Sequence, residues 1–217
     1  MTTIDHHRPP STTTRQPLPW QQGGCMQARR DVMNALDRRG AMWLLAASAW
    51  PATSRAEDAA ALLRAGGCVL MLRHASTTPG VGDPPEFQLG NCRTQRNLSA
   101  DGQAEARRIG AWFSRHQLTP RAVLTSAWCR CIDTAELAFG RHTPWAALNS
   151  SFGDRYPATD ATPSLRQALR AVPKGQCEVW VTHQVNITAI TGEVPAQAEG
   201  FVLDAGAKLL VRTRFET

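Results

Sequence analysis

Short apolar runs alternate with amphipathic segments along residues 57–217. Apolar runs bounded by glycine or polar residues predict buried strands, and apolar residues three or four positions apart predict helices. This pattern predicts strands at 68–72, 122–125, 145–148 and 178–182, helices at 58–64, 100–116, 129–139, 163–172 and 186–191, and a hairpin from 201–203 and 208–212. Because strands alternate with helices, we expect an α/β fold, a three-layer α/β/α sandwich with a mostly parallel central sheet.

Local signals support the first two longer helices. Ser99 precedes the helix predicted at 100–116 and is a favourable N-cap residue. Within that helix an apolar stripe is formed by Ala106, Ile109 and Phe113. The helix at 129–139 is expected to end at Gly140.

Two predicted strands each lead directly to a histidine. The run from Cys68 ends in Arg73 and His74, and the run from Glu178 ends in His183. Ligands bind at the carboxyl ends of the strands in open α/β sheets, so the two histidines are expected to meet there. The loop after His74 is rich in glycine and proline up to Asn97, which excludes a helix or strand over most of it.

The amino-terminal part of the chain differs in composition from the rest. Residues 1–56 hold seven Arg and three acidic residues, so the high pI of 9.4 comes mainly from this leader and nucleic-acid binding is not indicated. Residues 1–32 have no apolar periodicity and are interpreted as disordered or as lying upstream of the natural start. Residues 33–56 contain an arginine pair, an apolar stretch and small residues, the layout of a signal peptide. We therefore expect a leader at 1–56, a catalytic domain at 57–217 and a periplasmic or secreted protein. An amphipathic helix of a cytoplasmic protein is the alternative, and the apolar stretch is too short for a stable membrane anchor.

Four segments resemble the motifs of the histidine phosphatase superfamily, in the order seen there. They are Leu-Arg-His-Ala at 72–75, Asn-Leu-Ser-Ala-Asp-Gly at 97–102, Ser-Ala-Trp-Cys-Arg-Cys-Ile-Asp-Thr-Ala at 126–135 and Val-Thr-His-Gln at 181–184. The resemblance spans about residues 68–203 and implies a phosphoglycerate mutase-like fold. Ala75 stands where the superfamily usually has glycine, and both residues are small.

The resemblance implies roles for individual residues. His74 would be the nucleophile and form a phosphohistidine, with its other ring nitrogen held by a backbone carbonyl. Arg73 and Arg130 would bind the phosphoryl oxygens, because a guanidinium binds them bidentately and stays charged. His183 would hydrogen-bond the transferring group. Thr77 is a further predicted substrate-binding residue. The resemblance implies neither a metal nor another cofactor.

The proton donor for the leaving group does not follow from the motifs. Relatives with a clear acid carry Glu shortly after the third strand, where this chain has Ser150, and another branch has Asp where this chain has Gln184. Asp83 is the first candidate because it lies in the loop that follows the nucleophile, and an ordinary turn-capping role for it is an equal alternative. Glu86 and Asp154 are the next candidates.

We expect an exported phosphomonoester hydrolase with a small phosphorylated substrate, such as a sugar phosphate or an envelope saccharide phosphate. The predicted pocket mouth consists of residues 76–96 and 149–162. The alternatives are a non-catalytic phosphate-binding or phosphosaccharide-binding protein and a cytoplasmic phosphohistidine-protein phosphatase. The sequence does not indicate an oligomeric state.

Five cysteines follow the leader, and an oxidising compartment would pair some of them. Cys68 and Cys177 each precede one of the two histidines by six residues, so they are expected side by side as buried free thiols. A bond from Cys92 to either Cys129 or Cys131 would join the loop to the helix that carries Arg130. Residues two apart on a helix diverge by about 200°, so only one of these two cysteines can face Cys92.

Overall fold

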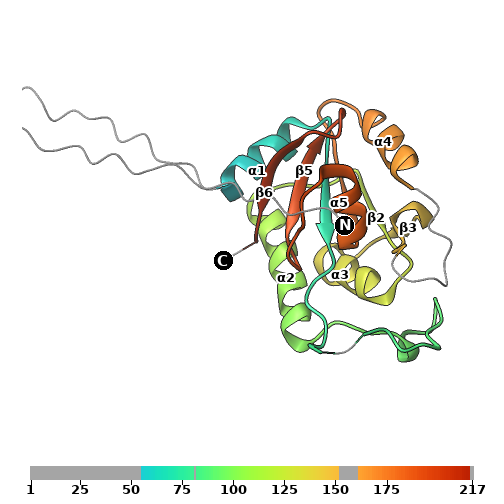
Figure 1. The fold of residues 1–217 in the computed structure, drawn as a ribbon. Coiled ribbons are helices and arrows are strands. Elements are labelled where there is room, and N and C mark those ends of the chain that lie inside the picture. Colours follow the sequence, from blue (N-terminus) through green and yellow to red (C-terminus); the bar gives the residue numbers. More distant parts are fainter. Residues whose placement is uncertain (1–54, 81, 152–160, 216–217) are drawn as a thin grey trace, which may run out of the picture. The chain divides into compact units, whose positions relative to one another are not determined.

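Six strands form one mixed sheet in the computed structural model, which describes residues 55–215 except 81 and 152–160 (Figure 1). The strand order is β3-β2-β4-β1-β5-β6, with bounds β1 Cys68–Arg73, β2 Ala122–Thr125, β3 Thr143–Pro144, β4 Cys177–Thr182, β5 Gly200–Asp204 and β6 Leu209–Thr213. The first four strands of this order are parallel, whereas β5 runs antiparallel to both β1 and β6. The predicted mostly parallel sheet and terminal hairpin are confirmed.

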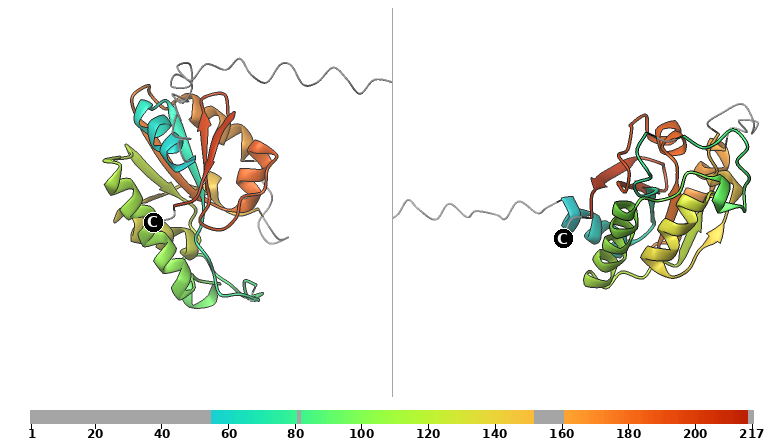
Figure 2. Two further views of the ribbon diagram at one scale, coloured as in Figure 1. Left: turned by 90° about the vertical axis from the view of Figure 1, so that its left-hand side faces the viewer. Right: turned by 90° about the horizontal axis from the view of Figure 1, so that it is seen from below.

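Helices cover both faces of the sheet (Figure 2). One face carries α1 Arg55–Ala65, α2 Ala100–Arg115 and α3 Cys129–Phe139, and the other carries α4 Thr162–Arg170 and α5 Gln184–Thr191. Side chains of β1 alternate between the two cores, because Leu70 and Leu72 pack on the first face and Val69 and Met71 on the second. The predicted three-layer α/β/α sandwich is therefore confirmed.

The strand predicted at 145–148 is wrong. The strand β3 is shorter and ends at Pro144, and η2 Ala146–Leu148 is a 3₁₀ turn. Trp145 packs against the Trp180 ring at 5.3 Å, after which the chain turns and buries Leu148 completely. The 3₁₀ turn brings Trp145 and Leu148 against the core. An edge strand at this place would leave such apolar side chains half exposed.

The α2 helix is fixed against the segment that follows β1. Its N-cap Ser99 accepts a hydrogen bond from the Gly102 backbone nitrogen, as predicted. A Cβ atom on Gly102 would lie only 1.8 Å from the Ser76 carbonyl oxygen. In addition, Ser76 donates hydrogen bonds to the Glu105 carboxylate from its backbone nitrogen and its hydroxyl, at 2.8 and 3.0 Å. These contacts place the backbone just after His74.

The predicted leader lies almost entirely outside the described residues. Of the proposed signal peptide at 33–56, only Arg55 and Ala56 are described, and they form the start of α1. Within 55–215, with the gaps named above, no helix has the length and apolar character needed to cross a membrane. Export and the leader boundary remain predictions.

Candidate active site

Two buried histidines lie side by side at the carboxyl ends of β1 and β4. These strands are parallel neighbours, and Arg73 pairs with Thr182 at the last position of the ladder. The next residue of each strand is a histidine, so His74 and His183 come together with ring centroids 5.5 Å apart. The sheet register alone thus explains a meeting of residues that are far apart in the sequence.

The ring of His74 has a defined orientation. Its Nδ1 lies 2.9 Å from the Ala75 carbonyl oxygen, which can only accept, so Nδ1 carries the proton and Nε2 keeps a lone pair. The pKa of His74 is lowered to about 3, mainly by burial and in addition by the positive charges of three nearby arginines, against the opposing effect of the carbonyl. His74 is therefore a neutral imidazole, the form that a nucleophile requires.

Three arginines line the same cavity, which has a volume of about 320 Å³. Arg73 donates a hydrogen bond to the Pro195 carbonyl at 2.8 Å, and the Arg130 guanidinium lies 4.5 Å from the centre of the Trp128 ring. The third, Arg96, comes from the segment before α2. Burial lowers the pKa of Arg73 and of Arg130, and the charge of Arg96 acts in the same direction on both.

Arg130 is placed by a threonine that also holds the segment after His74. The Thr134 hydroxyl donates to the Arg130 carbonyl at 2.6 Å and accepts from the Ala75 backbone nitrogen at 3.1 Å. This contact gives a physical reason for the four-residue spacing between Arg130 and Thr134, because one turn of α3 aligns them. The first turn of α3 is thereby joined to the segment that carries His74.

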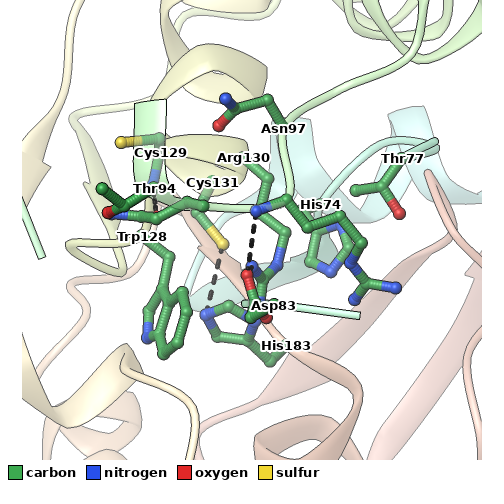
Figure 3. A network of polar contacts seen from close by, with 12 residues as sticks. His74, Thr77, Asp83, Thr94, Asn97, Trp128, Cys129, Arg130, Cys131 and His183 are labelled. Carbon is green, nitrogen blue, oxygen red and sulfur yellow. Dashed lines mark hydrogen bonds and ion pairs between the residues drawn. The ribbon is translucent and has the colours of Figure 1, made fainter. Parts of the chain in front are cut away.

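Asp83 lies in the cavity but faces an arginine. Its Oδ1 accepts hydrogen bonds from Nη1 of Arg130 and from the backbone nitrogen of Arg96, each at 3.0 Å (Figure 3). Of the other acid candidates, Glu86 is exposed and is not among the residues that line the cavity, and Asp154 lies outside the described residues. Of the acid candidates that the structure describes, the geometry therefore favours Asp83, which forms an ion pair with Arg130.

His183 is held by polar side chains at one ring nitrogen. Nε2 lies 2.8 Å from the Ser126 hydroxyl. The same nitrogen lies 3.5 Å from the Cys131 sulfur (Figure 3). The Ser126 hydroxyl in turn donates to Oδ1 of Asn149 at 3.1 Å. Burial lowers the pKa of His183 well below its ordinary value, and the charges around His74 act in the same direction.

The remaining predicted residues divide into two groups. Ser150 and Gln184 line the cavity, at the positions where the superfamily branches carry acids. Thr77 is not among the lining residues: it is buried, and its hydroxyl accepts a hydrogen bond from Gln197 at 3.3 Å. The geometry gives no support to the predicted substrate contact of Thr77, because the chain has already turned away from the cavity.

The cysteines follow the predicted arrangement. Cys92 and Cys129 form a disulfide with Cα atoms 5.6 Å apart, so Cys129 is the partner that α3 presents to the loop. Cys131 is free and points toward His183 instead. Cys68 and Cys177 are Cα partners in the β1–β4 ladder and are buried free thiols.

Arg96 was missed by the sequence analysis. Its segment is tied to α3 by the disulfide and by Gln95, whose side-chain oxygen accepts from the Cys129 backbone nitrogen at 3.0 Å. The available signal was its position, between Cys92 and the motif that begins at Asn97. A disulfide from Cys92 to α3 holds this short segment against the helix that carries Arg130.

Among the described residues, no group of three or more His, Cys, Asp or Glu side chains could hold a metal ion.

Neither a protein-family model nor a curated protein matches the chain. Many solved structures are similar to it, among them the following two. The protein histidine phosphatase SixA complexed with tungstate is 15% identical over 68% of this chain and 97% of its own, with a TM-score of 0.49. The protein TTHB049 from Thermus thermophilus is 17% identical over 68% of this chain and 99% of its own, with a TM-score of 0.48. The structures to which the chain is similar thus include a protein histidine phosphatase.

Proposed function

We propose that this chain is a phosphomonoester hydrolase that acts through a phosphohistidine at His74. The observation that carries the proposal is the arrangement around His74. Its Nδ1 proton is bound to a backbone carbonyl, its Nε2 keeps a lone pair, and Arg73, Arg96 and Arg130 line the same cavity. A neutral imidazole among several guanidinium groups suits nucleophilic attack on a phosphoryl group.

In the proposed reaction, Nε2 of His74 attacks phosphorus, a P–N bond forms, and the P–O bond to the leaving group breaks. The arginine charges offset the charge that develops on the equatorial oxygens. Water then attacks the phosphohistidine, which releases phosphate and restores the neutral imidazole. No step of this scheme requires a metal, and metal independence is part of the proposal.

The leaving alkoxide needs a proton, and Asp83 is the proposed donor. In the unliganded protein its carboxylate pairs with Arg130. A phosphoryl group that binds Arg130 would displace this carboxylate, and the nearby negative charge would raise its affinity for a proton. Asp83 would then be a carboxylic acid beside the leaving group.

Phosphate release from the full chain tests the proposal. The substrates are phosphorylated sugars, inositol phosphates and an aryl phosphate, and the variants are His74→Ala and His142→Ala. His142 is the control because it pairs with Glu136, away from the cavity. We expect loss of release and of acid-labile label for His74→Ala, and wild-type behaviour for His142→Ala. A His74→Ala protein that keeps a substantial fraction of the rate would contradict the mechanism.

We propose an exported enzyme that acts on sugar phosphates or on phosphorylated envelope saccharides. The proposal rests on the leader sequence, and recovery of a protein beginning near Glu57 from an extracytoplasmic fraction would support it.

One observation favours a second candidate function. The only acid that the described residues place in the cavity is ion-paired, so a substrate whose leaving group needs no proton donor would suit the site. A phosphohistidine-protein phosphatase has such a substrate, and release from phosphohistidine peptides but not from alkyl phosphates would favour it. A non-catalytic phosphate-binding protein would bind phosphate and release none from any of these compounds.

A further inference from the structure

The hydrogen bonds around His183 determine which of its ring nitrogens carries the proton. Oδ1 of Asn149 accepts from the Ala127 backbone nitrogen at 2.8 Å, which identifies this atom as the oxygen of the amide. The Ser126 hydroxyl has one proton and two neighbours that can accept it, Oδ1 of Asn149 at 3.1 Å and Nε2 of His183 at 2.8 Å. An amide oxygen can only accept, so when the proton lies toward Asn149 both contacts are hydrogen bonds if Nε2 of His183 donates to Ser126.

Cys131 leads to the same assignment independently. Its thiol donates toward the Thr182 carbonyl at 3.6 Å, and burial raises its pKa to about 12, so it keeps that proton. The sulfur, 3.5 Å from Nε2 of His183, is therefore also an acceptor there. Two acceptors face Nε2, and neutral His183 is the tautomer with the proton on Nε2 and a lone pair on Nδ1.

The lone pair on Nδ1 of His183 cannot form a hydrogen bond with a phosphoryl dianion, because both are acceptors. His183 is buried and lines the cavity, and its Nδ1 makes no hydrogen bond with the part of the chain that the structure describes. Phosphoryl oxygens of a dianion only accept, and a phosphomonoester is mostly a dianion above its second pKa of about 6. Two acceptors would therefore meet without a proton between them.

We propose that Ser126 and Asn149 hold the His183 proton on Nε2, so that a phosphoryl group binds in this cavity together with one additional proton, shared between Nδ1 and a phosphoryl oxygen. The inference rests on the proposed function, since it requires that phosphate binds beside His74. Ser126 and Asn149 are positioning residues, because they act through His183.

Other groups near His183 do not supply this proton. The ends of β1 and the loop after it contribute Arg73, His74, Asp83 and Arg96, and α3 contributes Arg130 and Cys131. The arginines stay charged, the His74 proton is bound to a carbonyl, and the Cys131 proton is bound to Thr182. Asp83 is the remaining group that could take up a proton, so it needs a control of its own.

Calorimetric titration of the full chain with inorganic phosphate tests the inference. At about pH 8 phosphate is a dianion, and titrations in two buffers of different protonation enthalpy give the number of protons taken up. In Asp83→Asn, which removes the proton that the proposed acid would take up, we expect about one proton per bound phosphate, and an association constant that falls about tenfold per pH unit above the second pKa of phosphate. Phosphate binding by this variant without proton uptake would overturn this inference alone. Absence of phosphate binding would overturn the inference together with the proposed function.

Three variants assign the proton. Asp83→Asn should keep the one proton that we assign to His183, and loss of uptake in this variant would move the proton to Asp83 and overturn the proposal. In the Asp83→Asn background, His183→Gln should bind phosphate without proton uptake, because an amide NH₂ donates to the dianion directly. In the same background, Ser126→Ala removes the stronger acceptor for Nε2–H, so His183 can turn its proton to Nδ1 and the uptake should fall below half.

A purely structural role for Ser126 would change affinity but not the number of protons. If Ser126→Ala does not fold, nitrogen NMR of the wild-type protein still decides, because the two imidazole tautomers have different cross-peak patterns. An unliganded His183 with its proton on Nδ1 would contradict the proposal.

Discussion

Oδ1 of Asp83 lies 3.0 Å from Nη1 of Arg130, and the two side chains are only 18% and 4% exposed. The same oxygen accepts from the backbone nitrogen of Arg96. The carboxylate of Asp83 thus occupies a place beside Arg130 that the proposed mechanism gives to a phosphoryl oxygen. We therefore expect substrate binding to be coupled to the release of the Asp83 carboxylate from Arg130.

Asp83→Asn should slow alkyl phosphates by about 100-fold but aryl phosphates much less, because a phenolate leaves without a proton donor. The measurement is kcat for a matched alkyl and aryl pair, with Glu136→Gln as the control, because Glu136 is exposed and does not line the cavity. Equal slowing of both substrates would reject Asp83 as the acid and direct attention to Glu86 or Asp154.

Arg96→Gln should weaken phosphate binding by about tenfold to a hundredfold, the range for a lost hydrogen bond to a charged group. Arg93→Gln is the matched control, because Arg93 is exposed on the same disulfide-tied segment and does not line the cavity. Titration with inorganic phosphate measures both variants. Equal affinities for the two would show that Arg96 does not contact the phosphoryl group.

Cys92→Ser should raise KM more than it lowers kcat, because the disulfide positions the Arg96 segment against α3 and takes no part in the chemistry. The bond closes a loop with a sequence separation of 37, for which chain entropy predicts a loss of about 4 kcal/mol in the free energy of unfolding. Steady-state kinetics and denaturant unfolding measure the two effects. A non-reduced digest analysed by mass spectrometry checks the pairing, and alkylation of Cys92 in the native protein would contradict it.

Gly102→Ala should destabilise the fold by at least about 2 kcal/mol, because the new methyl group would collide with the Ser76 backbone. Gly82→Ala is the control, since nothing lies within 4 Å of a Cβ atom there. Denaturant unfolding compares the two variants. Similar stabilities would mean that α2 and the segment after His74 move apart at little cost.

Acid should destabilise the wild-type protein partly through His74. Its pKa is about 3 in the folded state, against an ordinary value of 6.5, so the unfolded state binds more protons between these values. The free energy of unfolding should fall as the pH falls from about 6.5 toward 3, and His74→Gln should reduce this fall. Unfolding at several pH values tests this, with the surface variant His142→Gln as the control. Identical pH dependence in wild type and His74→Gln would show that His74 is not buried as a neutral ring.

The sequence by itself determined most elements and the meeting of the two histidines. Apolar periodicity is a local property, so α2, α3, β1 and β4 were predicted within a few residues, and the cap at Ser99 followed from its neighbours. His74 and His183 could be placed together because the ends of parallel strands share one edge of a sheet. The strand predicted at 145–148 was wrong because a short apolar run fits a strand and a buried turn equally well.

Only the tertiary structure decided how side chains from different elements meet. It selected Cys129 rather than Cys131 as the partner of Cys92, brought Arg96 into the cavity and paired Asp83 with Arg130. It also placed Ser126 and Cys131 on the same nitrogen of His183. These contacts depend on the packing of α3 against the sheet and on the path of the loop after β1, and spacing along the chain encodes neither.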